Sequence, residues 1–147
     1  MFNLNPFAIS NILTLITYIP LFILIALKGK TKLARMYTLH ILTIIWWGIT
    51  GFLIGINKDP KISLIIWEIA YSGVIFIPVT LYHSVMILTN KVSKGVLFFI
   101  YAQGVFFLIA TWAGKTLLAP KLIFNSFYFN YSSTLFLFSF IIKRSIK

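Results

Sequence analysis

The sequence contains no cysteine and only two acidic residues among its 147 positions. Without cysteine, the chain has no disulfide, no thiolate metal ligand and no thiol nucleophile. Asp59 and Glu68 are the only carboxylate side chains, which leaves little for acid–base or metal chemistry. A glycine-rich phosphate loop and a serine–histidine–aspartate set are missing as well. We therefore expect no enzyme, no cofactor and no metal site.

Charged residues of both signs are scarce too. They make up 10% of the chain, against roughly 25% in a soluble domain. Hydrophobic residues make up 60%, so the polar shell that a soluble domain of this size needs is lacking. The composition therefore indicates an integral membrane protein.

Long apolar runs are what the sequence has in abundance. A helix needs about 20 apolar residues to cross roughly 30 Å of hydrocarbon. The runs predict an all-α, polytopic transmembrane helix bundle, a single domain with spans at about 7–27, 36–56, 62–88, 95–112 and 122–142. The last is the weakest, because Asn125 and Asn130 interrupt it and its apolar part, Leu135–Ile142, is short. We expect that helix to begin near Phe129.

The basic residues lie in short clusters between these runs, which is typical of membrane-protein loops and not of a nucleic-acid-binding surface. With the N-terminus outside, the cytoplasmic segments hold nine of the 13 basic residues and the outer segments hold four. The nine are Lys28, Lys30, Lys32, Arg35, Lys91, Lys94, Lys143, Arg144 and Lys147. This asymmetry predicts a multi-pass protein of the cell (inner) membrane, with the N-terminus outside and the C-terminus in the cytoplasm.

Glu68 is the only acidic residue within a predicted span, and a charge in hydrocarbon costs several kcal/mol. It should therefore face the bundle interior or water. Tyr71 and Ser72 share its helix face at spacings i+3 and i+4. Trp47, in the middle of the second span, either packs against other helices or lines a cavity. These four residues are the candidate ligand-binding site; alternatively, Glu68 is a shallow carboxylate that reaches the headgroups or pairs with a loop lysine.

Other residues within the spans have simpler interpretations. His40 and His83 could form a proton or metal pair, but no third ligand is visible, which favours two interfacial histidines with satisfied hydrogen bonds. Trp67 and Trp112 are expected at the outer membrane interface. Pro78 predicts a bend in the third helix, because a proline frees a carbonyl one turn earlier.

Three glycines, Gly48, Gly51 and Gly55, line up on the second predicted helix. Small residues let helix backbones approach closely in lipid. The pattern predicts close packing within the bundle, with a homodimer face as the sharper alternative.

A pattern across the second and third spans is also informative. A tryptophan in the middle of the second span, Trp46 or Trp47, precedes a short polar loop, the run IWEIAYSG at 66–73, and Pro78. This pattern over Met36–Leu88 resembles the N-terminal seven-transmembrane region of sensor histidine kinases.

The resemblance implies a sensory, signal-input module of a bacterial two-component system, with a cytoplasmic output domain as its partner. The stretch Phe127–Phe140 is similar to that family's fifth span in its aromatic character. The family has seven spans and usually continues into PAS, kinase or cyclase domains, whereas this chain supplies five spans at most. We therefore expect either a fragment of a longer reading frame or a reduced stand-alone homologue. A small transporter or channel subunit is the alternative, although Glu68, Asn57 and Gln103 are sparse and scattered for a polar path.

Overall fold

The computed structural model describes residues 5–113, 121–123 and 127–129. These residues form four long helices and one two-stranded sheet: α1 (Pro6–Lys28), α2 (Lys32–Ile56), α3 (Pro60–Leu88), α4 (Lys94–Trp112), β1 (Lys121–Ile123) and β2 (Phe127–Phe129). All four helices are long and apolar enough to cross a membrane. The first four predicted spans are thus confirmed as helices, each beginning slightly before its predicted start.

The predicted fifth span, 122–142, is not among the helices that the structure describes. Its first part contributes instead to an antiparallel pair in which Lys121 lies opposite Phe129 and Ile123 opposite Phe127. Aromatic and β-branched residues favour strands, and a short apolar run is compatible with either a strand or a helix. The described residues therefore supply four spanning helices, and the rest of the predicted fifth, 130–142, lies outside them.

Side-chain caps fix where the first three helices begin. The capping residues are Asn5, Thr31 and Asp59, whose side-chain oxygens accept hydrogen bonds from the backbone N–H groups of Ala8, Ala34 and Lys61 at 2.8, 3.1 and 2.7 Å. Such caps satisfy donors that the first turn of a helix leaves unpaired. At the start of α4, Ser93 makes no side-chain capping bond.

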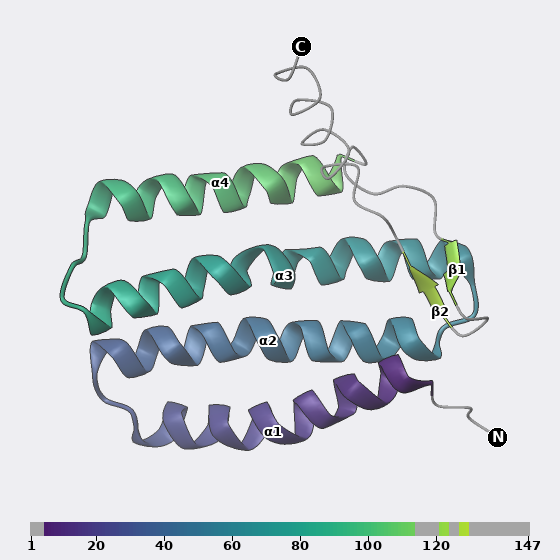
Figure 1. Cartoon of the computed structure of the whole chain (residues 1–147), viewed down its shortest axis with the longest axis horizontal. Helices are drawn as coiled ribbons and strands as arrows, with labels where there is room; N and C mark the ends of the chain where they lie inside the picture. The colour runs from purple at the N-terminus through teal and green to yellow at the C-terminus, as the bar shows by residue number, and fades with distance from the viewer. Residues whose placement is uncertain (1–4, 114–120, 124–126, 130–147) are drawn as a thin grey trace, which may run out of the picture.

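The four helices lie side by side in chain order, as Figure 1 shows, and each packs mainly on its neighbour in sequence. The helices α2 and α3 form the centre, where eight residues of each are buried. The outer helices α1 and α4 bury two residues each. The strand β2 lies near α2.

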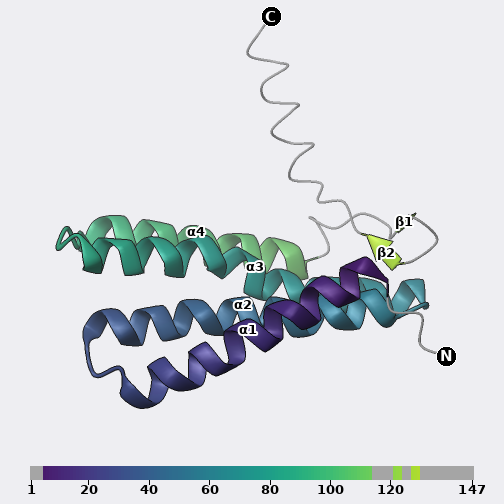
Figure 2. The same cartoon turned by 60° about the horizontal axis from the view of Figure 1, so that its bottom comes forward.

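The two ends of this array differ in charge. The basic end, where α1 and α3 finish and α2 and α4 begin, carries Lys28, Lys30, Lys32, Arg35, Lys91 and Lys94. Figure 1 and Figure 2 both show that α1 lies against α2 at its N-terminal end and diverges from it toward the basic end. The array is therefore tighter at one end than at the other.

Candidate functional site

An aromatic cluster of Phe7, Trp47, Trp67 and Tyr71 joins the first three helices. The ring centroids of Trp47 and Trp67 lie 5.9 Å apart, and those of Trp67 and Tyr71 lie 6.0 Å apart. Phe7 meets Trp47 edge-on at 6.4 Å. These separations fall within the range that favours attractive ring contacts. The cluster therefore connects α1, α2 and α3 near the end opposite the basic one.

Trp67 is the centre of this cluster and is only 2% exposed. It packs with Ile54 and Ala70 in the buried core. The prediction that Trp67 faces the membrane interface is therefore wrong. Because α3 is apolar on most of its faces, the sequence gives little indication of which face turns inward. Trp112, by contrast, is 67% exposed at the end of α4.

Trp46, next to Trp47, connects α2 to α3 on another side. Its indole N–H is 3.1 Å from both the Ser72 hydroxyl and the Ile69 carbonyl oxygen, and the Ser72 hydroxyl donates to that carbonyl. Gly73 makes this approach possible, because a Cβ there would lie 2.6 Å from Cδ1 of Trp46. Trp46 and Ser72 also line a hollow of about 550 Å³ that reaches Tyr101 on α4.

Glu68 lies apart from both groups. It is half-buried and lines a hollow of about 230 Å³ with Ile65, Ile69 and Trp112, between α3 and the end of α4. The four predicted ligand residues are thus divided: Trp47 and Tyr71 belong to the aromatic cluster, Ser72 bonds to Trp46, and Glu68 faces α4. Helical neighbours on one broad face can still point to different partners. Ligand binding by these residues stays a prediction.

Each histidine bonds to a hydroxyl on a neighbouring helix. Nδ1 of His40 is 3.1 Å from the Thr80 hydroxyl oxygen, and Nδ1 of His83 is 3.0 Å from the Tyr101 hydroxyl. The Thr80 hydroxyl also lies 2.8 Å from the Phe76 carbonyl oxygen of its own helix. In the part of the chain that the structure describes, no three His, Asp or Glu side chains could hold a metal ion. The two hydrogen bonds fit the interpretation of histidines with satisfied partners, and their position at the membrane interface stays a prediction.

The glycines Gly48, Gly51 and Gly55 all face α1 of the same chain. A Cβ at Gly48 would lie 2.9 Å from the Leu15 side chain, and one at Gly55 would lie 2.8 Å from the Ala8 Cβ. At Gly51, the Asn11 side chain occupies the space that a Cβ would need. These glycines therefore let α1 pack closely on α2, and α1 covers the face that was the alternative dimer surface.

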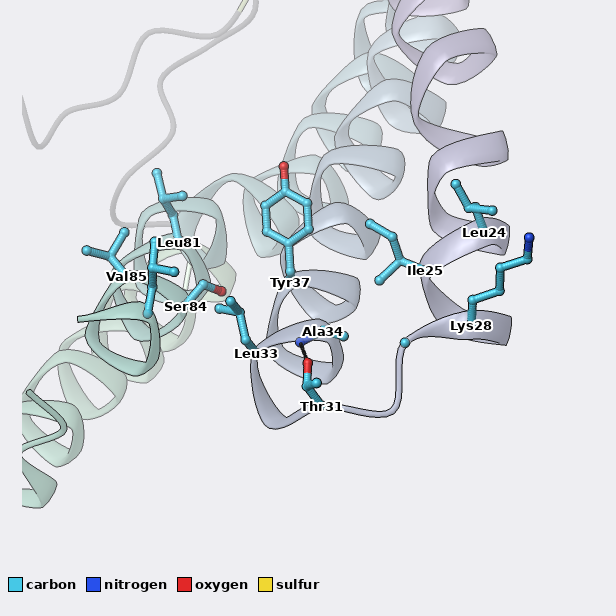
Figure 3. Close-up of a pocket in the computed structure, with 12 residues that line it drawn as sticks. Leu24, Ile25, Lys28, Thr31, Leu33, Ala34, Tyr37, Leu81, Ser84 and Val85 are labelled. Atoms are coloured by element: carbon cyan, nitrogen blue, oxygen red, sulfur yellow. Dashed lines mark hydrogen bonds between the residues drawn. The ribbon is translucent and has the colours of Figure 1, made fainter. Parts of the chain in front are cut away.

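A hollow of about 750 Å³ lies at the basic end, and we call it the basic-end groove. Ile25 and Lys28 of α1 line one side and Leu81 and Val85 of α3 line the other. Figure 3 shows Tyr37 of α2 between the two helices, with Ile25 on its side of α1. The sequence did not indicate this groove, because its lining residues are ordinary apolar span residues drawn from three helices.

Most polar side chains within the described helices donate to a carbonyl of their own helix, as Thr14 does to Ser10 and Ser84 to Thr80, and a few polar pairs join neighbouring helices. His40 with Thr80, His83 with Tyr101 and Trp46 with Ser72 each cross from one helix to the next. In the described helices, these pairs do not form a continuous polar path. The arrangement is suited to binding apolar groups and to holding one helix packing against another.

Comparison with protein-family models, with curated proteins and with solved structures finds no significant match. The resemblance to the sensor region of histidine kinases therefore depends on the sequence pattern alone.

Proposed function

We propose that this chain is the membrane-embedded sensory module of a histidine kinase-type receptor. It receives a signal within or at the surface of the membrane and passes it to a cytoplasmic output domain as a change in helix packing. The pattern at 66–73 with Pro78 supports the family assignment. The contacts between the helices support the mechanism.

The observation that carries the mechanism is the loose contact between α3 and α4. The helix α4 buries only Gly104 and Thr111, and its N-terminus has no side-chain cap. Hollows of about 420 and 230 Å³ lie between α3 and α4, and Pro78 lines the larger one. A helix that borders hollows can shift without disturbing the core, because few packed side chains must move with it.

Within residues 5–113, few contacts hold α4 in its present position. The His83–Tyr101 hydrogen bond is one, and the close approach of Gly104 to the Phe76 ring is another. Signalling requires two packings whose populations the stimulus can change by binding one of them better. We infer that movement of α4 against a fixed α1–α2–α3 unit supplies these two packings.

Introduced cysteines test this mechanism cleanly, because the chain has none of its own. The pair Val79→Cys/Gly104→Cys would link α3 to α4, where a Cβ on Gly104 lies 3.5 Å from the Val79 side chain. The matched pair Leu15→Cys/Gly48→Cys would link α1 to α2, where the corresponding distance is 2.9 Å. Each pair is placed in the chain joined at its C-terminus to a histidine kinase domain, and autophosphorylation is measured before and after oxidation in membranes.

We expect oxidation of the α3–α4 pair to change autophosphorylation severalfold and to remove its response to altered bilayer composition. Oxidation of the α1–α2 pair should leave both unchanged, since that contact is already close. Reduction should restore the original behaviour. Equal effects of both disulfides, or no effect of either despite complete cross-linking, would overturn the proposal.

A further inference from the structure

We propose that the basic-end groove binds one anionic phospholipid, with its phosphate beside Lys28 and Lys32 and an acyl chain along the apolar walls. The proposal goes beyond the sensory function and does not depend on it. It follows from three observations: the positive charge at this end, the apolar lining of the groove, and the helix packing that leaves the groove open.

The charge at this end has one sign. The described loops and helix ends there carry Lys28, Lys30, Lys32, Arg35, Lys91 and Lys94. The only two acidic residues of the chain, Asp59 and Glu68, lie in the opposite half of the array. The N-terminus of α2 adds the positive end of a helix dipole at the groove. Basic clusters next to membrane helices attract anionic headgroups, and each added cation strengthens that attraction.

The lining of the groove is suited to a hydrocarbon chain. Its walls are mainly leucine, isoleucine and valine side chains. Two of its few polar groups already have partners, since the Ser84 hydroxyl donates to the Thr80 carbonyl and Thr31 caps α2. These two groups therefore have little left to offer a polar ligand inside the groove. An apolar groove that is lined by Lys28 and lies at the basic end of the helices favours a molecule with an anionic head and an apolar tail.

The groove is open because α1 is drawn toward α2 only at its other end. The close contacts of Gly48, Gly51 and Gly55 involve the first half of α1. Toward Lys28 no such glycine lies on α2, and the Tyr37 ring stands between α1 and α3 (Figure 3). The opening is therefore built into the packing of the three helices.

Native mass spectrometry of the detergent-purified full chain tests the proposal. The protein is mixed with equal amounts of phosphatidylglycerol and phosphatidylcholine, or with inorganic phosphate alone, and the bound fractions are compared. We expect a clear excess of phosphatidylglycerol adducts and no retained phosphate. The lipid preference should fall as salt is raised, because screening weakens headgroup contacts.

Two matched variants locate the headgroup. Lys28→Gln/Lys32→Gln should weaken phosphatidylglycerol binding by about fivefold per removed charge and leave phosphatidylcholine binding unchanged. Lys91→Gln/Lys94→Gln removes the same charge from the turn between α3 and α4, and its effect should be much smaller. Equal losses of phosphatidylglycerol binding in the two variants would indicate general attraction to the basic surface and would contradict a headgroup site at Lys28 and Lys32.

A third variant locates the acyl chain. Leu81→Trp fills the groove from an exposed position on α3 and keeps every charge. We expect it to reduce phosphatidylglycerol binding while the protein stays monodisperse on size exclusion. Unchanged lipid binding in this variant, no preference between the two lipids, or equally strong retention of inorganic phosphate would each overturn the proposal. If the double lysine variant fails to fold, the salt dependence of the unchanged protein and Leu81→Trp still decide the question.

Discussion

The two outer helices, α1 and α4, bury equally few residues but are attached to the central pair in different ways. Three glycines of α2 bring α1 close, and the Asn5 side chain also donates to the Gly55 carbonyl at 2.8 Å. The helix α4 meets α3 through one glycine, Gly104, with one hollow beside that contact and another near Trp112 at the end of α4.

This difference shows that burial alone does not measure how firmly a helix is held. In lipid, the solvent is as apolar as the side chains, so close backbone packing and interhelical hydrogen bonds hold helices together. By this criterion α1 belongs to the core of the molecule, although most of its surface is exposed. The helix α4 is the element whose position can change at the lowest cost.

The largest expected change in the free energy of unfolding comes from the aromatic cluster that joins α1 to α2 and α3. We expect Trp67→Ala to lower the free energy of unfolding by about 3–5 kcal/mol, because it leaves a cavity where three helices meet. Trp112→Ala on α4 should change it by less than about 0.5 kcal/mol, since that ring is largely exposed. Unfolding in mixed detergent micelles with increasing sodium dodecyl sulfate measures both. Similar losses in the two variants would remove the distinction between core and edge.

Substitutions at Gly55 and Gly104 test the difference between the attachment of α1 and that of α4. Gly55→Leu should lower the free energy of unfolding by about 2–3 kcal/mol, because its side chain would meet the backbone of Ala8. Gly104→Leu should cost less than about 1 kcal/mol, since it meets the Phe76 ring, which can turn toward a hollow. Gly95→Ala is the control, because the new methyl group would meet nothing within 4 Å beyond its chain neighbours and its own helix backbone. The same unfolding assay applies, and a larger loss at Gly104 than at Gly55 would contradict the comparison.

Removing hydrogen bonds between helices should give a smaller difference in unfolding free energy between the centre of the molecule and α4. Thr80→Val removes the hydroxyl partner of the buried His40 ring, and we expect a loss of about 1–2 kcal/mol in unfolding free energy. Tyr101→Phe removes the partner of the half-buried His83 and should cost about 0.6 kcal/mol, the average found for such bonds in membranes. If Tyr101→Phe proved the more costly, α4 would be held more firmly than its packing indicates.

The smallest effect concerns Pro78. Pro78→Ala supplies the N–H that the Val74 carbonyl lacks, so α3 should straighten. Spin labels at Ile62 and Leu88, both exposed, should then move apart by about 1 Å, as expected for a modest bend in a helix of this length. An unchanged distance would show that the proline does not bend α3.

The four helices could be predicted because their boundaries are local features of the sequence. Apolar runs of sufficient length end at residues such as Lys28 and Asn57, and Asp59 precedes a proline that can occupy a first helical turn. The fifth prediction, 122–142, is wrong at 122–123 and 127–129, where the structure has strands, because a run rich in phenylalanine and tyrosine suits a strand as well as a helix.

The candidate site was harder to predict, because it depends on contacts between helices. The sequence shows that Tyr71 and Glu68 are neighbours on α3, but it does not show that Trp67 lies between Trp47 and Tyr71. The spacing of the glycines on α2 was more informative, because small residues at successive turns can only mark a close approach. Nothing in the sequence indicated that His83 pairs with Tyr101, since each is one of many polar groups in an apolar span.

The arrangement of the helices in chain order has a consequence for biosynthesis. Because each helix packs mainly on the one before it, a newly inserted span meets its partner already in the membrane. The glycine contacts between α1 and α2 can form before α3 has been synthesised, and the aromatic cluster follows when Trp67 arrives. Contacts between sequence neighbours form quickly, because little chain entropy is lost in bringing them together. The described helices can therefore assemble one at a time during synthesis, with α4 added to a finished three-helix unit.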